Sequence, residues 1–297
     1  MKNKNSIVIP KIIGGLGNQM FQYAFARALA LKNNAELKLD ILDFKNYEFH
    51  NYSLNNFSIQ ETYATKAEVA PFKRHKRKRG VLGKLLNPFL YNPRIYVVEE
   101  ISTFNPQMPQ LTPPCYLEGY WLSEKYFLPI KDLIQKEFAL KTPLSEYSKG
   151  VAEKINATPE SISFHIRRGD FVKHASVSKH HGICPPEYYE ESIRILNEKF
   201  PLGEYFVFSD DIEWAKENLK TGRPTTFIGQ GPDKNYEDLE LMRLCKHHVL
   251  SNSTFGWWGA WLSGERGNAI TIAPKKWLAK PFDTSDLIPT RWITLPY

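Results

Sequence analysis

The carboxy-terminal half of the chain alternates short apolar segments with longer amphipathic ones. Residues 161–166 alternate apolar and polar positions, as a strand does, and residues 205–208 are apolar throughout, as in a strand buried on both faces. The pattern predicts further strands at 225–228, 248–250 and 269–273, and helices at 185–200, 212–219, 235–247 and 254–263. Alternating strands and helices indicate βαβ units and therefore a doubly wound parallel sheet.

The amino-terminal half is less regular. An apolar segment at 7–13 predicts a strand, and Pro10 within it indicates an edge strand or a late start, because proline cannot donate to a sheet ladder. Apolar residues at helical spacing over 20–31 predict a helix, and 37–42 predicts a second strand. Residues 51–112 mix prolines and aromatics without a clear period, so no element is assigned there.

A chain of 297 residues is long for one hydrophobic core and fits two domains of about 150 residues each. We therefore predict an α/β protein of two domains, residues 1–150 and 151–297. No apolar run approaches the roughly 18 residues that span a bilayer. The basic start of the chain is not followed by an unbroken apolar core, so we expect no secretory signal and a cytoplasmic location.

Cysteine usage and charge narrow the class of protein. The three cysteines, Cys115, Cys184 and Cys245, lie far apart without CxxC spacing, which predicts buried free thiols and neither a disulfide framework nor a zinc site.

The net charge is +7, and much of it lies in the basic run 73–79. Such a run could bind nucleic acid, contact anionic lipid head groups or simply be exposed to solvent. Because this run alone supports it, we expect no nucleic-acid partner.

Dense polar clusters follow three of the predicted strands: His165-Ile166-Arg167-Arg168-Gly169-Asp170, Ser209-Asp210-Asp211 and Ser251-Asn252-Ser253-Thr254-Phe255-Gly256. In an open parallel sheet, ligands bind beyond the carboxyl ends of the strands. If the three strands are neighbours, the clusters line one crevice.

The first cluster predicts phosphate binding. His165 and Arg167 share one face of their strand, and an arginine fork pairs well with a phosphate. Each charge-assisted hydrogen bond contributes roughly 1.5–3 kcal/mol. Arg168 has two interpretations, a second anion ligand or a surface ion pair with Asp170.

The third cluster opens a predicted helix, whose exposed N–H groups and dipole favour an anion. The hydroxyls of Ser253 and Thr254 could add donors, while Ser251 or Ser253 could simply cap the helix. Trp257, Trp258 and Trp261 follow, as core residues or with one of them as a sugar platform.

Residues 14–19, Gly-Gly-Leu-Gly-Asn-Gln, lie between a predicted strand and helix. They match neither the dinucleotide fingerprint, because Met20 replaces its third glycine, nor a P-loop. Asn18 could instead reach a ligand held by the second domain.

No metal site is predicted. Asp210-Asp211 lacks the D-x-D spacing that holds a divalent ion under a nucleotide sugar. His174, His180 and His181 are scattered over a predicted loop, where solvent exposure is the simpler explanation.

The segments 14–23, 165–170 and 253–261 resemble the bacterial α-1,2-fucosyltransferases. Supporting matches are Gly182 to Tyr189, Phe208-Ser209-Asp210, Leu241-Met242 with Cys245 and His247, and Gly119-Tyr120-Trp121 with Tyr126-Phe127. The matches cover most of the chain and are specific in combination. Two departures are Gly256, where the family often has serine, and Pro10 in the first strand.

The resemblance implies a GT-B-like architecture of two Rossmann-like domains facing a cleft, with residues 1–150 on the acceptor side and residues 151–297 binding the GDP-sugar. It implies an inverting galactoside α-1,2-fucosyltransferase, of the hexosyltransferase class, that needs no metal and no cofactor because GDP-fucose is a substrate. The acceptor would be a terminal galactose on an oligosaccharide or lipid-linked glycan, in polysaccharide or O-antigen biosynthesis. A lipid-linked acceptor would favour peripheral contact of the basic run 73–79 with the inner face of the membrane.

Under this hypothesis Arg167 holds the diphosphate and stabilises the leaving charge, Asn18 closes on the sugar or phosphate, and Asp170 is a weak candidate for the base. The other candidate substrate-binding residues are Gly15, Gly17, His165, Arg168, Asp210, Ser253, Thr254 and Phe255. Alternatives are another GDP-sugar, another acceptor hydroxyl, a protein acceptor, or a non-catalytic protein that binds nucleotide or glycan. The natural acceptor is not readable, because acceptor pockets are built from variable loops.

Overall fold

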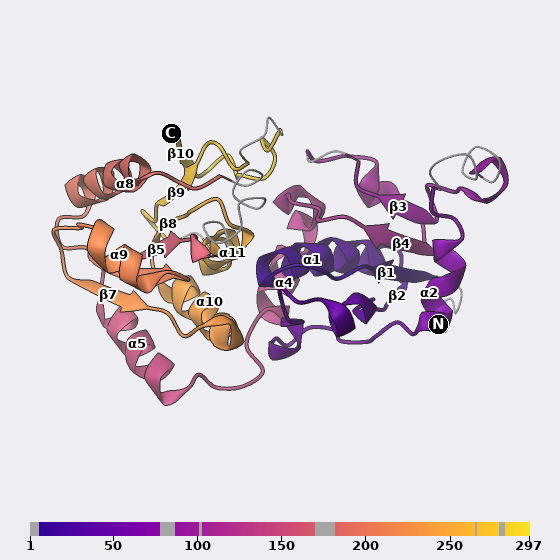
Figure 1. Cartoon of the computed structure of the whole chain (residues 1–297), viewed down its shortest axis with the longest axis horizontal. Helices are drawn as coiled ribbons and strands as arrows, with labels where there is room; N and C mark the ends of the chain where they lie inside the picture. Colours follow the sequence, from indigo (N-terminus) through magenta and orange to yellow (C-terminus); the bar gives the residue numbers. More distant parts are fainter. Residues whose placement is uncertain (1–5, 78–86, 101–102, 170–181, 265, 279–282) are drawn as a thin grey trace. The chain divides into compact units, whose positions relative to one another are not determined.

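The computed structural model describes residues 6–77, 87–100, 103–169, 182–264, 266–278 and 283–297. Contacts divide the chain into unit 1, Met1–Lys141 with Ser285–Leu287, and unit 2, Thr142–Thr284 with Ile288–Tyr297 (Figure 1). The division predicted at residue 150 would cut helix α5 (Glu146–Ala157), which lies entirely in unit 2. None of the described helices is long and apolar enough to cross a membrane.

Unit 1 is built on a four-stranded parallel sheet in the order β2-β1-β4-β3. Its strands are β1 (Ile7–Pro10), β2 (Glu36–Leu37), β3 (Tyr96–Val98) and β4 (Cys115–Glu118). Its helices are α1 (Leu16–Lys32), α2 (Lys66–Lys73) and α4 (Lys131–Glu137), with 3₁₀ turns η1 (Leu42–Asn46), η2 (Leu54–Asn56), η3 (Met108–Gln110), η4 (Glu124–Tyr126) and η5 (Leu128–Ile130). Helix α1, the longest of these, packs against β1 and β2.

Strand β1 is central in this sheet, so the expectation of an edge strand from Pro10 is wrong. Pro10 is the last residue of β1, and its carbonyl accepts a hydrogen bond from the Asp40 amide at 2.9 Å. The next amide, that of Lys11, donates to Leu117 on the other side at 2.9 Å. These neighbouring bonds hold the register although the proline has no N–H to donate.

Unit 2 is built on a six-stranded parallel sheet in the order β10-β9-β8-β5-β6-β7. Its strands are β5 (Ser161–Ile166), β6 (Glu204–Ser209), β7 (Thr225–Ile228), β8 (His247–Val249), β9 (Thr271–Pro274) and β10 (Ile293–Leu295). Besides α5, its helices are α8 (Pro186–Lys199), α9 (Ile212–Asn218), α10 (Asn235–Leu244) and α11 (Thr254–Ser263), with the 3₁₀ turn η6 (Pro232–Lys234). The chain runs outward from β5 to β7 and then returns to β8, so the predicted doubly wound sheet is confirmed.

The unit 2 sheet is covered on both faces (Figure 1). Tyr205 and Val207 of β6 pack with residues of α8 and α9, whereas Phe206 and Phe208 pack with residues of α5 and α10. Burial on both faces favours apolar residues throughout, which explains the continuous run in β6, whereas the equally buried β5 carries Ser161, Ser163 and His165. In α11, Trp257, Trp258 and Trp261 are all buried in the core, so none of the three is an exposed sugar platform. The three cysteines are buried and free, as predicted.

A polar side chain caps helix α9. The cap is Asp211, whose carboxylate accepts the Trp214 amide at 3.4 Å. The hydroxyl of Ser209 accepts the amide of Asp211 itself. Asn235 is the first residue of α10, and the residue before it, Lys234, makes no side-chain capping bond. The choice among adjacent polar residues depends on the direction in which the chain leaves the preceding strand, and the local sequence does not encode that direction.

Candidate functional site

The three predicted polar clusters lie at the carboxyl ends of neighbouring strands. β8, β5 and β6 are adjacent in the sheet, and the chain reverses its winding between β5 and β8. Such a switch point is where ligands bind in doubly wound folds, because the connections on its two sides leave in opposite directions. The structure therefore brings the first, second and third clusters to one edge of unit 2.

Arg167 and Asp210 meet at this edge. Nη1 of Arg167 lies 3.0 Å from Oδ2 of Asp210, and the two side chains are 28% and 25% exposed. The other carboxylate oxygen of Asp210 accepts the Arg168 amide at 2.8 Å. A Cβ on Gly169 would lie 2.8 Å from Asp210 Oδ2, so glycine at this position lets the carboxylate approach. Arg167 thus lies at the surface of the strand end, and its role as a phosphate ligand stays a prediction.

Arg168 stacks on an aromatic ring. Its guanidinium carbon lies 3.8 Å from the centroid of the Trp214 ring on α9, and its Nε lies 3.7 Å from an oxygen of Asp211. That separation is too long for a hydrogen bond, and buried Nε has no hydrogen-bond partner among the described residues. Stacking of this kind orders the guanidinium. Asp170, the candidate base and the suggested ion-pair partner of Arg168, lies outside the described residues.

His165 is buried and neutral. A hydrogen bond joins its Nδ1 to Ser251 Oγ at 2.9 Å, and its ring centroid lies 5.5 Å from that of Phe255. Burial lowers the pKa of His165 to about 4, although the charge of Asp210 opposes the shift. A Cβ on Gly256 would lie 2.8 Å from the same Nδ1. His165 therefore ties β5 to α11, and its close approach depends on the absence of a side chain at Gly256.

The start of α11 is capped and only partly buried. Ser253 is the cap, since its Oγ accepts the Phe255 amide at 3.3 Å and its carbonyl accepts the Trp257 amide at 3.1 Å. Ser253, Thr254 and Phe255 are half-buried, whereas the rest of the helix is buried. The capping interpretation is correct, and it leaves the predicted anion site at this helix start open.

In unit 1 the glycine-rich turn is held by a buried glutamine. Gly14 has φ +85°, and a Cβ there would lie 2.9 Å from Asn18 Nδ2. Gln19, which is fully buried, donates to the carbonyls of Gly14 and Asn51 at 2.8 and 2.9 Å and accepts the Ser53 amide at 3.0 Å. The tight turn predicted from the glycines is thus built around Gln19.

A second buried glutamine, Gln22, joins two strand-end loops. It accepts the amide of Ile13 at 3.0 Å and donates to the carbonyl of Gly119 at 3.1 Å. The roles of both glutamines were missed in the sequence. The available signal was two glutamines three residues apart on a mostly apolar helix.

The other candidates in this segment are less constrained. A Cβ on Gly15 would lie 3.6 Å from the His50 ring, an ordinary contact, so sterics alone do not demand glycine there. Gly17 is buried in the first turn of α1, and Asn18 is half-buried beside it. Asn18, Gly15 and Gly17 belong to unit 1, and the other described candidates belong to unit 2.

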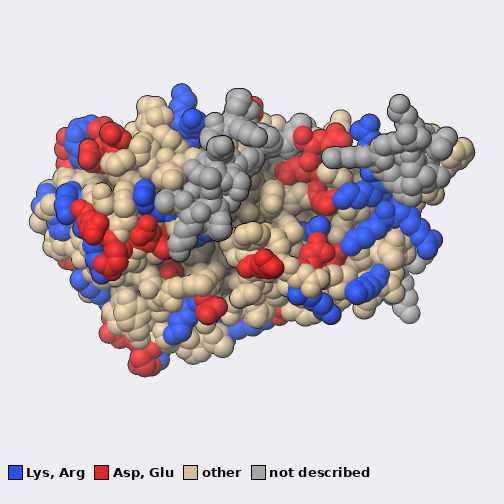
Figure 2. All heavy atoms as spheres, in the orientation of Figure 1, with Lys and Arg blue, Asp and Glu red and all other residues tan. Residues whose placement is uncertain are grey.

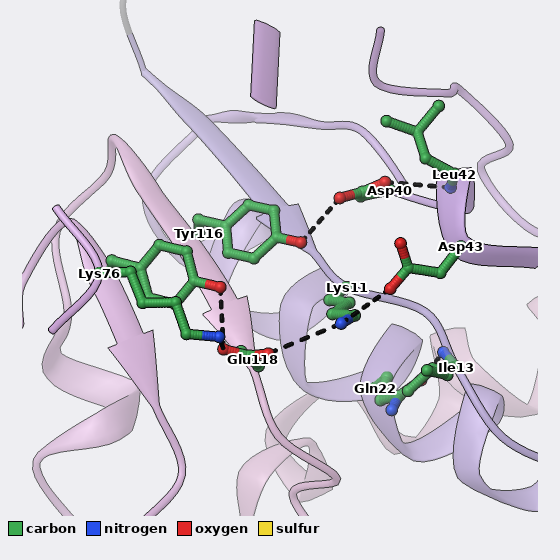
Figure 3. Close-up of polar contacts among 10 residues, drawn as sticks. Lys11, Ile13, Gln22, Asp40, Leu42, Asp43, Lys76, Tyr116 and Glu118 are labelled. Carbon is green, nitrogen blue, oxygen red and sulfur yellow. Dashed lines mark hydrogen bonds and ion pairs between the residues drawn. The ribbon is translucent and has the colours of Figure 1, made fainter. Parts of the chain in front are cut away.

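An ionic cluster that the sequence did not reveal lies at the carboxyl edge of the unit 1 sheet (Figure 3). Lys11 follows β1, and its Nζ lies 2.8 Å from Asp43 and 3.6 Å from Glu118 at the end of β4. Beside it, Tyr116 donates to buried Asp40 at 2.7 Å. Burial lowers the pKa of Lys11, but the hydrogen bond and charge of Asp43 outweigh it and raise the pKa overall. The charged forms of Lys11, Asp43 and Glu118 therefore stabilise one another, since the pKa of each carboxyl is lowered.

The basic run contributes to this cluster. Lys76 lies 2.7 Å from Glu118 and 5.3 Å above the ring of Tyr96, whose hydroxyl also donates to Glu118. On the face shown in Figure 2, Lys and Arg side chains gather over the part of unit 1 around α2. Of the run 73–79, the structure describes residues 73–77, and one of their charges is neutralised within the unit.

Within the described ranges, no three His, Cys, Asp or Glu side chains are grouped so that they could hold a metal ion. His174, His180 and His181 lie outside those ranges.

Residues 5–295 match the family model described as Glycosyl transferase family 11. The chain belongs to this family. It is 36% identical to an α-1,2-colitosyltransferase of Escherichia coli, over 98% of this chain and 99% of the relative. It is 32% identical to the O-antigen biosynthesis glycosyltransferase WbnK of Escherichia coli, over 95% and 98% of the two chains. Human galactoside α-(1,2)-fucosyltransferase 1 is 26% identical over 53% of this chain and 45% of its own length.

The fold is similar to a solved structure of Arabidopsis thaliana FUT1, a mutant in complex with GDP, with a TM-score of 0.53 at 13% identity over 90% of this chain and 70% of that one. This likeness confirms the predicted GT-B-like α/β fold class. Membership of family 11 confirms the resemblance read from the motifs, and it makes the chain a glycosyltransferase.

Proposed function

We propose that this family 11 enzyme transfers L-fucose from GDP-fucose to the 2-hydroxyl of a terminal galactose, with inversion. The observation that carries the proposal is the edge of unit 2, where Arg167, Asp210 and the start of α11 meet at the switch point of the sheet. A partly exposed guanidinium beside a helix N-terminus favours a diphosphate. The fucosyltransferases among the relatives support the identity of the sugar.

In the proposed reaction, the acceptor oxygen attacks the anomeric carbon as the bond from that carbon to the diphosphate oxygen breaks. GDP leaves with the electron pair, and Arg167 stabilises its developing charge. A preorganised donor of this kind contributes about 10²–10³ in rate. Asn18 of unit 1 is proposed to contact the sugar or phosphate, and the acceptor proton passes to Asp170 or to solvent.

We propose that the side chains and the helix start replace a metal in neutralising the diphosphate. We propose for the other donor-site residues the roles expected from the sequence, and we refine the role of His165. Neutral, buried His165 positions Ser251 and the start of α11, and it carries no charge to the phosphate.

Colitose is the second candidate sugar, because the chain is 36% identical to a colitosyltransferase over 98% of its length. Colitose differs from fucose in lacking the hydroxyl at carbon 3. A site that hydrogen-bonds this hydroxyl would reject the deoxy sugar by about 10⁴–10⁵, whereas an apolar site would discriminate by only about 10². The ratio of kcat/KM for the two GDP-sugars therefore identifies the donor and the kind of pocket together.

The proposed acceptor is a galactose-terminated oligosaccharide or a lipid-linked glycan of O-antigen or polysaccharide synthesis, as for the relative named for O-antigen biosynthesis. We propose a cytoplasmic enzyme that contacts anionic lipid through its basic run. Lys76 is paired with Glu118, so the neighbours of Lys76 within the run would make that contact.

The test is an assay of purified protein with GDP-fucose, GDP-colitose and GDP-mannose, each with lactose and a set of galactosides, followed by linkage analysis of the product. We expect an α-1,2-linked product from GDP-fucose or, as the second candidate, from GDP-colitose. A product from GDP-mannose alone, or a different linkage, would overturn the proposal. A failure of acceptor to stimulate GDP release from any of the three donors would favour a non-catalytic binding protein.

A further inference from the structure

A hollow lies at the carboxyl edge of the unit 1 sheet. It encloses about 390 Å³, including its open mouth, and is lined by Val98, Glu99, Glu100, Asn105, Met108, Trp121 and Tyr126. Its walls come from the segments that follow β3 and β4, and the glycine-rich turn follows neighbouring β1 at the same edge. Ligands of parallel α/β sheets bind at this edge.

Glu99 shapes one wall of the hollow. Its carboxylate oxygens accept the amides of Tyr120 at 2.6 Å and Trp121 at 2.9 Å. A Cβ on Gly119 would lie 2.4 Å from the Cβ of Glu99, and Trp121 has φ +59°. The loop after β4 is therefore wrapped around this carboxylate, in a conformation that a side chain on Gly119 would prevent.

The charge of Glu99 is not balanced by a cation. Glu118, on the same edge, is paired with Lys76 and Lys11, whereas within the described part of the chain no lysine or arginine pairs with Glu99. Burial raises the pKa of Glu99 although the two backbone amides oppose the shift. Glu100 is exposed beside it, and no hydrogen bond or ion pair of its side chain appears among the described residues.

Donors complete the lining. Trp121 is 1% exposed, and its indole Nε1 has no hydrogen-bond partner among the described residues. Tyr126 accepts the amide of Asn105 through its hydroxyl oxygen at 2.9 Å, so its own O–H is directed elsewhere. A buried N–H without a partner costs about 1–3 kcal/mol, which a bound oxygen would offset. The hollow thus combines carboxylate acceptors and aromatic surface with a buried indole N–H that has no partner among the described residues.

We propose that this hollow binds one neutral sugar ring of the acceptor glycan. The lining residues that the structure describes include carboxylates and no lysine or arginine, so the hollow disfavours the diphosphate of the donor. A sugar carries hydroxyls that donate and accept, and C–H faces that pack on aromatic rings, which is the combination the lining matches. The proposal depends on the glycosyl-transfer function above and locates its acceptor site.

Two variants test the subsite without disturbing its frame. Val98→Trp places a bulky ring in the lining from a position that is 42% exposed at the end of an edge strand, and Glu100→Ala removes a carboxylate that pairs with none of the described residues. Leu31→Trp is the matched control. Leu31 is 47% exposed near the carboxyl end of α1, and α1 runs from the carboxyl edge of the sheet back to the opposite edge.

Binding of methyl β-galactoside is measured by NMR titration with and without GDP, and acceptor and donor KM are measured in the transfer assay. We expect Val98→Trp to raise the galactoside Kd and acceptor KM at least roughly tenfold, and Glu100→Ala to raise them roughly fivefold, with donor KM within twofold of wild type. The Leu31→Trp control should match wild type in all three.

The outcomes separate the subsite from the proposed function. If the wild-type protein binds the galactoside in a Val98→Trp-sensitive way but transfers neither fucose nor colitose, the subsite stands and the proposed function fails. If transfer occurs and Val98→Trp leaves both acceptor constants within twofold, the subsite is wrong. Absence of saturable galactoside binding by wild type, with and without GDP, would overturn it as well.

Discussion

Replacing Arg167 with alanine tests the electrostatic core of the proposed donor site. The substitution removes the guanidinium that lies 3.0 Å from Asp210 at the switch point and leaves the Arg168 amide bonded to the same carboxylate at 2.8 Å. Both side chains of the lost pair are about a quarter exposed. Pairs of this kind contribute about 0–1 kcal/mol to stability, so the variant should fold.

The effect on catalysis should be far larger than the effect on folding. Loss of one preorganised donor to a developing oxyanion lowers the rate by about 10²–10³. Arg167→Lys keeps the charge but loses the planar fork, so roughly a tenfold loss is expected, the equivalent of one charge-assisted bond. A fall in kcat with little change in donor KM would show that Arg167 acts mainly in the transition state.

Arg194→Ala is the matched control. Arg194 lies on α8 with a side chain 55% exposed, and it pairs with Glu191 and Glu198, so its removal also deletes an arginine and its local ion pairs. Steady-state rates of GDP release in the presence of acceptor, together with thermal unfolding, are measured for all three variants. The proposed donor site is wrong, and Arg167 does not hold the diphosphate, if the Arg167→Ala and Arg194→Ala variants both release GDP at rates within about threefold of wild type.

Three further predictions concern the frame of the two units. Gly119→Ala should destabilise the protein by about 1–3 kcal/mol in urea unfolding, because its Cβ would overlap Glu99 at 2.4 Å; stability equal to wild type would contradict this. Gln22→Leu should lower the free energy of unfolding by about 2–5 kcal/mol in the same assay, since the Ile13 amide and the Gly119 carbonyl lose their partner. Burial lowers the pKa of His165 to about 4, so the stabilisation present above about pH 6.5 should be lost as the pH falls towards 4; urea midpoints of wild type should fall more steeply over that window than those of His165→Asn, and equal slopes would refute the assignment.

The regular part of the fold was readable from the sequence because each signal was local. Residues 161–166 and 225–228 were predicted as strands with the bounds that the structure has, and 254–263 as a helix with its bounds. Their periods can be read from a few contiguous residues. β3, β4 and β10 were not assigned from the sequence.

The candidate site, like the fold, was predictable from the sequence only in part. The motif around Arg167 and the start of α11 could be identified as strand-end clusters, and their meeting at one edge needed only the order of the strands. The stacking of Arg168 on Trp214 and the burial of neutral His165 against Gly256 depend on which helices pack over the edge. No spacing in the sequence contains that information.

The sequence by itself determined the class of fold, the doubly wound second half and the family, because periodicity and motifs are properties of contiguous residues. Only the tertiary structure decided that β1 is central despite Pro10, that Gln19 and Gln22 hold the strand-end loops, and that Glu99 faces a hollow without a balancing cation among the described residues. Gln19 bonds to a residue 32 positions away in the sequence, and Gln22 to one 97 positions away. Contacts at such separations form when the strands take their order in the sheet. The role of each side chain then depends on the neighbours that this order brings to it.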